Sequence, residues 1–382
     1  MSGAPIDRVV TDVGGDARSR TMRLIVGRSL AECVESGRDN ILVLRLLAAL
    51  MVVFGHSYVL VGQDAYLYEP MHWLFPRMYA HIAGVTIFFT ISGFLITLSF
   101  LRRPELSRFV RARVLRLWPA LAIAVAACSF VLGPILSTMP AHDYFTRGDD
   151  GGTVYRYFWT NVSLFGIWPS LPGVFADNPV PRHVNGSLWT IPYEAMMYVG
   201  VAAAGTLRLF RFPWLASFVI AAVFSAIVLW PMYAGMHALG NVPLLGLQLA
   251  GCFGAGSIAC LLRRYVPVST ALMILLVLVG LVLRQTPFMW LAVLYFVFWF
   301  AYVPRLPSIP RQLDLSYGTY LWAFPLQQTI IQVAGVTRPL VLFAAATPIV
   351  LVVALASWLL IEKPALRLKN VRWRRAALPE PV

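Results

Sequence analysis

The stretch ILVLRLLAALMVVFGHSYVLV, residues 41–61, decides the fold of this chain. Its length matches the roughly 20 apolar residues that a helix needs to cross the hydrocarbon core of a bilayer. Only Arg45 and His56 in this stretch can carry a charge. Because so apolar a run has no polar face to turn toward water, it predicts a transmembrane helix.

The rest of the chain repeats this pattern. Of its 382 residues, 59% are hydrophobic and only 13% are charged, whereas soluble domains carry about 25% charged residues. The runs lack the apolar–polar alternation of barrel strands. The sequence therefore predicts an all-α integral membrane protein with about ten transmembrane helices, at 41–61, 82–101, 114–136, 187–207, 214–232, 243–262, 267–284, 288–304, 314–333 and 339–361.

The distribution of positive charge predicts the orientation. Cytoplasmic loops of membrane proteins are enriched in Lys and Arg. Of the 31 Lys and Arg residues, 24 lie in the two terminal segments and in alternate loops or at the adjoining span ends, six lie in or beside the other loops, and Arg45 lies within the first span. We therefore expect both termini in the cytoplasm. The net charge of +14 then needs no nucleic-acid partner, and anionic membrane lipids suffice.

The polar ends suggest three regions. Residues 1–40 carry six Arg against six acidic residues and lack the apolar core of a signal peptide, so they predict a disordered cytoplasmic tail. Residues 41–362 form the transmembrane domain, and residues 363–382 form a basic cytoplasmic tail. The four cysteines have neither metal-ligand spacing nor a disulfide pattern, which indicates buried thiols and no metal site.

Two ionisable residues share one face of the first span. Arg45 and His56 are eleven residues apart, almost three helical turns, or roughly 16 Å along the axis. This spacing predicts a cation near the cytoplasmic entrance and an imidazole in the outer half of the membrane. The alternatives are an arginine that snorkels to the interface and a histidine packed in the core.

A carboxylate is predicted at the depth of this histidine. Counted from Ser187, Glu194 should lie roughly 10 Å below the outer surface, and His56 roughly 7 Å below it. A carboxylate beside an imidazole raises its basicity and fixes its tautomer, as a general base requires. A purely structural ion pair or hydrogen bond is the alternative for Glu194.

An arginine-rich segment precedes the third span. Arg113 and Arg116 are three residues apart, before Pro119, and so share a helix face. Guanidinium groups bind phosphates in bidentate geometry. These arginines could equally satisfy the positive-inside rule or hold anionic lipid headgroups.

Taken together, these segments resemble the acyltransferase 3 family, which includes bacterial enzymes that O-acetylate lipopolysaccharide, exopolysaccharide and Nod-factor sugars. The similarity covers roughly residues 38 to 370. The segments that carry it are Arg45–His56, Phe88–Thr97, Arg113–Pro119, Ser187–Glu194 followed by Met197 and Tyr198, Leu315–Trp322 and Ile361–Pro364.

The resemblance implies an acyl-CoA-dependent O-acyltransferase in the bacterial inner membrane. Acyl-CoA, with acetyl-CoA as the expected form, would bind from the cytoplasm as a substrate, and no permanent cofactor is implied. The acceptor would be a hydroxyl of a sugar or polysaccharide on the outer side. Arg45, Arg113 and Arg116 would then bind the donor.

The remaining site residues follow the same division. His56 would deprotonate the acceptor hydroxyl, or would itself carry the acyl group. Glu194 would orient His56 or hold the sugar. Trp189 and Tyr193 would stack on a sugar ring, although aromatic residues are common at membrane interfaces in any case.

Two other functions fit the same polar residues. One is a transporter or flippase for an envelope glycan, which would consume no acyl-CoA. The other is a different class of membrane acyltransferase that acts on lipids or proteins. The sequence does not indicate the sugar, the hydroxyl position, the acyl chain or the oligomeric state.

Overall fold

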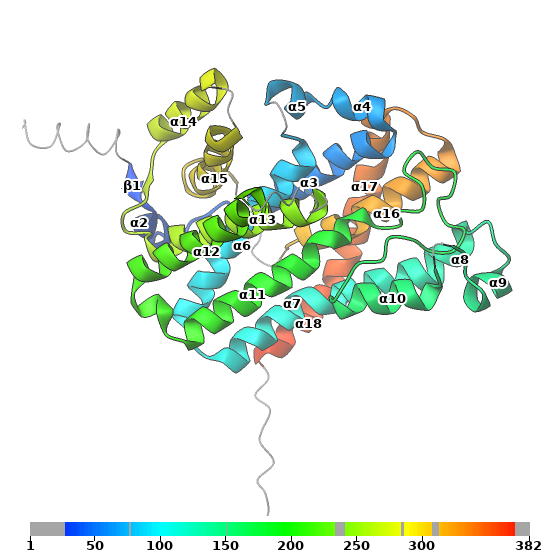
Figure 1. Cartoon of the computed structure of the whole chain (residues 1–382), viewed down its shortest axis with the longest axis horizontal. Helices are drawn as coiled ribbons and strands as arrows, with labels where there is room; N and C mark the ends of the chain where they lie inside the picture. Colours follow the sequence, from blue (N-terminus) through cyan, green and yellow to red (C-terminus); the bar gives the residue numbers. More distant parts are fainter. Residues whose placement is uncertain are drawn as a thin grey trace, which may run out of the picture. The chain divides into compact units, whose positions relative to one another are not determined.

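Every apolar segment predicted as a span contains a helix in the computed structural model (Figure 1). The structure describes residues 27–75, 78–150, 152–233, 241–283, 286–307 and 313–370. The helices that match the ten predicted spans are α3 (Ile41–Leu60), α6 (Ala80–Arg102), α7 (Leu106–Ala127), α11 (Ile191–Thr206), α12 (Pro213–Tyr233), α13 (Asn241–Leu261), α14 (Thr270–Leu283), α15 (Thr286–Tyr302), α16 (Ser316–Ala334) and α17 (Pro339–Ser357).

Shorter elements lie between and beside these helices. Two strands, β1 and β2, pair antiparallel. The shorter elements are β1 (Arg28–Ser29), β2 (Pro267–Val268), α2 (Leu30–Glu35), α4 (Gln63–Leu67), α5 (Pro70–Leu74), α8 (Gly133–Leu136), α9 (Ala141–Thr146), α10 (Val154–Ser163), α18 (Lys363–Arg367), the 3-10 helices η2 (Gly186–Thr190), η3 (Leu209–Arg211) and η5 (Leu368–Asn370), and the π-helical turns η1 (Cys128–Leu132) and η4 (Trp358–Glu362).

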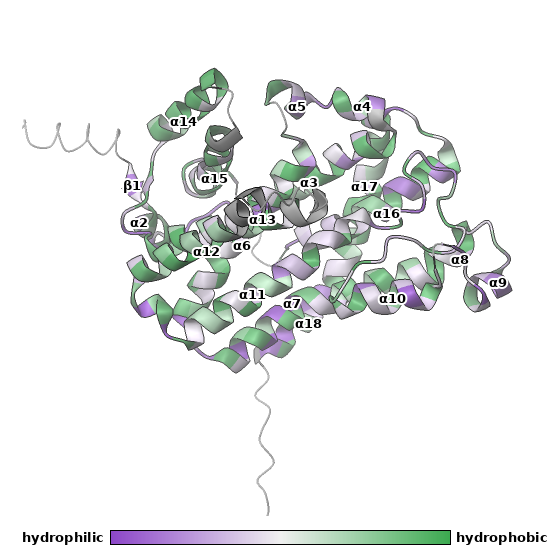
Figure 2. Cartoon of the chain, viewed as in Figure 1, coloured by the Kyte–Doolittle hydropathy of each residue, from purple (hydrophilic) through white to green (hydrophobic). Residues whose placement is uncertain are grey.

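The length and hydropathy of the helices support a membrane protein. Among the described residues, four helical segments are long and apolar enough to cross a bilayer: Ile41–Leu60, Ala80–Arg102, Leu106–Leu136 and Pro339–Arg367. Figure 2 shows hydrophobic residues covering α12 and α14, and hydrophilic residues on α9 and around α18. That all ten segments cross the membrane, and on which side the termini lie, remain predictions.

Two compact units make up the chain. The first contains the described part of residues 1–40 together with Arg263–Leu306, and the second contains Ile41–Leu262 with the residues after Leu306. Helices α14 and α15, which fall within the predicted transmembrane domain 41–362, belong to the first of these units.

Within the first unit, part of the predicted disordered tail is ordered. Ser29 caps α2 by accepting from the Glu32 backbone N–H, and Glu32 accepts from the Ser29 N–H in return. Leu30 and Cys33 are buried, and the Leu30 N–H donates to the Val266 carbonyl. Burial of these apolar side chains explains why this segment is ordered. The mixed charge of residues 1–40, on which the prediction of disorder rested, does not reveal it. Residues 1–26 and 371–382 of the predicted tails lie outside the described residues.

Within the second unit, small and polar residues bring three helices close together. Helix α6 packs against both α3 and α13. A Cβ on Gly93 would collide with the backbone of Phe253, so only glycine permits this approach. The Thr97 hydroxyl donates to Ser257 Oγ across the same contact at 3.0 Å. Small residues and interhelical hydrogen bonds are the usual means of helix packing in membranes.

Helix α16 joins α3 to α17. Gln327 of α16 donates to the Val53 carbonyl at 2.9 Å and to Ser57 Oγ at 2.7 Å. Two long helices contain a π-turn, η1 after α7 and η4 after α17. Such turns often mark functional sites, and the second one contains Glu362. All four cysteines are free and buried, which confirms their interpretation as buried thiols.

Candidate functional site

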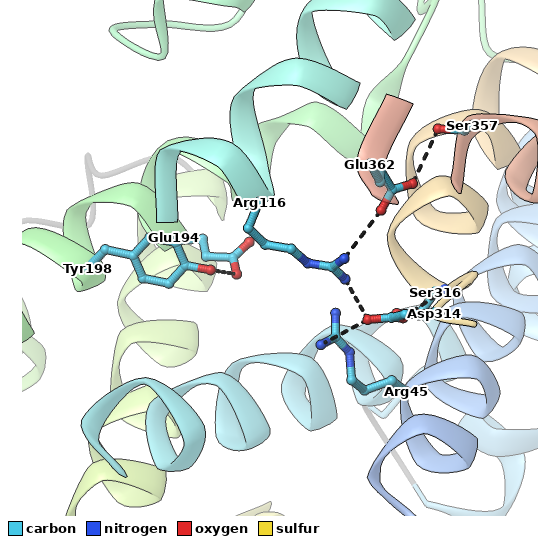
Figure 3. Close-up of polar contacts among 8 residues, drawn as sticks. All are labelled: Arg45, Arg116, Glu194, Tyr198, Asp314, Ser316, Ser357 and Glu362. Atoms are coloured by element: carbon cyan, nitrogen blue, oxygen red, sulfur yellow. Dashed lines mark hydrogen bonds and ion pairs between the residues drawn. The ribbon is translucent and has the colours of Figure 1, made fainter. Parts of the chain in front are cut away.

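A cluster of largely buried charges connects α3, α7, the residues just before α16 and the π-turn η4 in the second unit (Figure 3). Arg116 of α7 donates to Asp314 Oδ2 at 2.7 Å and to Glu362 Oε2 at 3.3 Å. Arg45 of α3 pairs with the same Asp314 oxygen at 3.4 Å. Glu362 is 1% exposed at its side chain. Two carboxylates, one just before α16 and one in the turn after α17, therefore hold two guanidinium groups in place.

Each carboxylate of this cluster has a hydroxyl partner. Ser316 donates its hydroxyl to Asp314 Oδ1 at 2.6 Å, and its backbone N–H to the same oxygen at 3.3 Å. The Ser357 hydroxyl donates to Glu362 Oε1 at 3.2 Å. Buried ions need such additional hydrogen bonds to offset their desolvation. The two carboxylates are therefore held in fixed positions, and through them both arginines.

Glu194 of α11 lies beside this cluster but makes a different contact. Its carboxylate accepts a hydrogen bond from the Tyr198 hydroxyl, one helical turn later. Figure 3 shows Glu194 near the side chain of Arg116, with Tyr198 on its other side. The Arg113 guanidinium lies 5.8 Å from the centroids of both the Tyr198 and the Phe109 ring. Its Nε is buried without a hydrogen-bond partner among the described residues.

These side chains surround a cavity of about 100 Å³. Three cations and one anion reach it, and the rest of its wall is apolar or hydroxylated. The Arg45 Nε is also buried without a partner in the described chain. The lining residues used below are Arg45, Arg113, Arg116, Glu194, Tyr198 and Tyr320. Two guanidinium groups with unused N–H donors make this cavity suited to an anionic or strongly polar ligand.

A second, larger cavity of about 400 Å³ adjoins the first. Arg113 and Leu95 line both cavities. The larger cavity has five cationic side chains and no acidic residue in its wall: Arg102, Arg103, Arg108, Arg113 and Lys369. A concave surface lined only by positive charges concentrates anions, so this cavity fits a ligand with several phosphates.

His56 lies elsewhere on α3, outside the walls of both cavities. Its ring centroid is 5.4 Å from that of His81 at the start of α6, and 5.2 Å from the ring of Phe324 on α16. The side chain is 9% exposed, and its Nδ1 has no hydrogen-bond partner among the described residues. This ring nitrogen is therefore available to a ligand that can hydrogen-bond to it, as far as the described residues show.

The predicted pairing of His56 with Glu194 is wrong. Glu194 lies with Arg45 and the other arginines, not with the histidine eleven residues further along α3. The count started from Ser187 as a residue at the end of a span, but Ser187 is 1% exposed and packed among other helices. It lies in the buried helix η2, where the Tyr320 hydroxyl donates to its carbonyl at 2.8 Å and Asn185 donates to the Leu321 carbonyl at 2.9 Å. The chain thus enters the helix bundle before α11 begins.

The two predicted acceptor residues pack against each other. The ring centroids of Trp189 and Tyr193 are 6.0 Å apart, at an interplanar angle of 74°. Tyr193 also lies against Gly246 of α13, where a Cβ would collide with its ring. Neither residue lines the two cavities described above. A role in acceptor binding stays a prediction.

Sequence reasoning missed four residues of the site. Asp314 is the first residue of the predicted span 314–333, and Glu362 lies in Ile361–Pro364, one of the segments that carry the family resemblance. Tyr198 was quoted without a role. His81 directly precedes the predicted span 82–101. The signal for the two carboxylates was the need of buried arginines for counter-ions, and the sequence alone did not show which acidic residues supply them.

Comparison with known proteins identifies the family. Residues 38–361 match the model of the acyltransferase domain family known as acyltransferase 3. The chain belongs to this family. An O-acetyl transferase of Shigella phage Sf6 is 29% identical over 84% of this chain and 93% of its own length. Nodulation protein 10 of Rhizobium leguminosarum bv. viciae is 26% identical, over 87% of this chain and 94% of its own length.

Family membership supports the general activity. No solved structure matches the chain, so the arrangement of the site rests on the present structure. As a member of the acyltransferase 3 family with a relative named O-acetyl transferase, the protein is an O-acyltransferase of the membrane. Its donor, its acceptor and the roles of single residues are matters of proposal.

Proposed function

We propose that the protein transfers an acyl group, acetyl in the first instance, from cytoplasmic acyl-CoA to a hydroxyl of an extracytoplasmic sugar or polysaccharide, in the inner membrane of a bacterium. The observation that carries this proposal is that Arg45 and His56 lie in two different environments on the same helix, α3. Arg45 opens on a cavity that continues into a strongly basic one, and His56 stands unpaired further along the same helix.

The donor would bind where the cations gather. Coenzyme A carries its phosphates at one end and its thioester at the other, so it suits a basic cavity that leads to a narrower one. The larger cavity would hold the phosphates, and Arg113 would stand where the pantetheine arm passes into the smaller cavity. This arrangement favours Arg113 over Arg116 as a phosphate ligand, since both terminal nitrogens of Arg116 already contact carboxylates.

The contacts of Glu194 suit a role in binding the donor better than a role in orienting His56. Its partner Tyr198 lies under the Arg113 guanidinium, and a carboxylate beside a cation favours the charged form of both. In our proposal Glu194 and Tyr198 together position Arg113. Arg45 and Arg116, held by Asp314 and Glu362, would keep this end of the bundle positive.

The chemical step would then take place at His56. A ring nitrogen of His56 accepts the proton of the sugar hydroxyl while the hydroxyl oxygen attacks the thioester carbonyl carbon. The carbon–sulfur bond breaks, and the departing sulfur takes the proton from the imidazolium. The products are the sugar ester and free coenzyme A, so no other reactant is required. The buried imidazole suits this role, because none of the described residues hydrogen-bonds to its Nδ1.

The decisive test measures both products. Membranes that contain the protein are incubated with acetyl-CoA and with envelope polysaccharide from cells that lack the gene. We expect free coenzyme A and polysaccharide-bound acetyl to appear in equal amounts. Movement of glycan across the membrane without consumption of acetyl-CoA would instead identify a transporter or flippase.

A further inference from the structure

His81 gives the proposed base a second imidazole as its neighbour. The two ring planes meet at 33°, with their centroids 5.4 Å apart. The Phe324 ring stands edge-on to His56, at 82°. His81 belongs to α6 and His56 to α3, so the pair joins two helices that pack along their length.

The position of His81 is fixed by its surroundings. Gly55, next to His56, lets the start of α6 approach α3, because a Cβ there would lie 2.8 Å from His81 Nδ1. Tyr66 and Tyr79 each place a ring 5.9 Å from that of His81, and Tyr66 stacks on Tyr79 at 3.9 Å. The imidazole is thus held by a glycine on one helix and by a stack of phenol rings.

The entry to α6 is held just as firmly. Glu69 is fully buried, and its carboxylate accepts from the backbone N–H groups of His72 at 2.9 Å and Ala80 at 3.4 Å. This side chain ties the turn before α5 to the first residue of α6, directly before His81. Burial, with Tyr79 and Glu69 nearby, raises the pKa of Tyr66, so this phenol stays neutral.

Neither imidazole has a hydrogen-bond partner in the part of the chain that the structure describes, and the Nδ1 atoms of both are buried. A buried polar atom without a partner costs about 1–3 kcal/mol. If residue 81 only filled space, an apolar ring would stabilise the fold more, because it leaves no buried polar atom unpaired. Two unsatisfied imidazoles in contact therefore indicate a ligand with two hydrogen-bonding groups close together.

We propose that His81 binds the hydroxyl next to the one that is acylated, and so selects which hydroxyl of the acceptor reacts. This inference rests on the proposed function. Hydrogen bonds of about 2.8 Å from two rings in contact can reach two hydroxyls on neighbouring carbons, so the acceptor is a sugar that presents a vicinal diol. His56 takes the proton of the reacting hydroxyl, and His81 hydrogen-bonds the other hydroxyl without exchanging a proton.

The test replaces His81 by Phe, which keeps the ring and its packing but removes both nitrogens. His72→Phe is the matched control, because His72 also stacks on Tyr79, at 4.5 Å, whereas the rings beside His56 are those of His81 and Phe324. Membranes with each variant receive acetyl-CoA and polysaccharide from cells that lack the gene. The initial rate is measured, and NMR spectroscopy locates the ester on the sugar.

We expect His81→Phe to lower the rate about tenfold or more, since the neighbouring hydroxyl would be buried without a partner. The remaining ester should spread over neighbouring hydroxyls, while the KM for acetyl-CoA stays unchanged. His81→Asn, which can still hydrogen-bond, should recover part of the rate and of the selectivity. The control should behave as the wild type does.

Three results would overturn this role of His81. One is acetylation of the same single hydroxyl by His81→Phe at the control's rate. Another is a loss of rate that appears entirely as a higher KM for acetyl-CoA. The third is failure of both His81 variants to reach the membrane, which would make the residue one of packing. Failure of the wild-type protein to acetylate any sugar would instead refute the proposed function.

Discussion

The second unit contains two buried polar clusters that differ in one respect. In the arginine–carboxylate cluster, each charge faces an opposite charge: Arg116 contacts Asp314 and Glu362, and Arg45 contacts Asp314. In the histidine pair, neither ring has a hydrogen bond among the described residues. A satisfied cluster contributes to the assembly of the helices, whereas an unsatisfied one is free to react. The comparison predicts that mutations in the first affect stability and mutations in the second affect chemistry.

The largest effect should follow removal of the imidazole at His56. His56→Ala should lower the rate of acyl transfer by 10²–10⁴, the usual loss for a general base. His56→Gln can form a hydrogen bond but cannot take the proton at neutral pH, so it should fail almost as badly. Coenzyme A release in membranes is the measurement, with the amount of protein in the membrane as the control. A His56→Gln protein of near-normal rate would show that the histidine is structural.

Removal of a charge from the satisfied cluster should instead destabilise the folded protein. Asp314→Asn leaves Arg45 and Arg116 without their shared counter-ion, and breaking a buried pair from one side costs about 3–5 kcal/mol. The expected result is a lower midpoint of thermal unfolding in detergent, with Asp314→Glu closer to the wild type. Should Asp314→Asn unfold normally and lose only activity, the cluster would belong to the chemistry and the comparison would fail.

Arg113 and Arg116 sharpen the comparison, because they lie one turn apart on the same helix. Arg113→Ala should raise the KM for acetyl-CoA about ten- to a hundredfold, the loss of one charge-assisted phosphate contact of about 1.5–3 kcal/mol. Stability should change little, since Arg113 forms no ion pair with the described residues, whereas Arg116 forms two. Arg116→Ala should show the opposite pattern of lower stability. If both variants turn over normally at low donor concentration, these arginines are only signals of membrane orientation.

The sequence predicted the helices well because their signal is local. Each span is an apolar run that can be recognised without knowing its neighbours, and α3 and α6 were predicted to within about two residues. Arg45, His56 and Glu194 could be singled out as candidates, because an ionisable residue inside an apolar run is unusual, but their roles stay predictions.

The partners of these groups were harder to predict because they depend on where each helix begins. Glu194 was assigned to His56 by counting from Ser187, but the chain near Ser187 is already buried against α16. The carboxylates that do neutralise the arginines come from positions 314 and 362, about 200 residues or more from Arg116. Such contacts follow from the packing of helices, which no local pattern in the sequence records.

The smallest effect should come from the exposed cations of the larger cavity. Arg108 and Lys369 line this cavity yet are exposed to solvent, so water and salt screen their attraction for a phosphate. An exposed ion pair is worth only about 0–1 kcal/mol, so Arg108→Ala should raise the KM for acetyl-CoA no more than about fivefold. The effect should shrink as salt is added, whereas that of Arg113, which is partly buried and has a fully buried Nε, should persist. Measuring both variants at about 0.05 M and about 0.5 M salt, on either side of the range in which screening becomes strong, separates the two kinds of cation. Equal salt dependence for Arg108→Ala and Arg113→Ala would show that Arg113 acts only through the general positive field of this surface, and the donor would then have no dedicated phosphate ligand on α7.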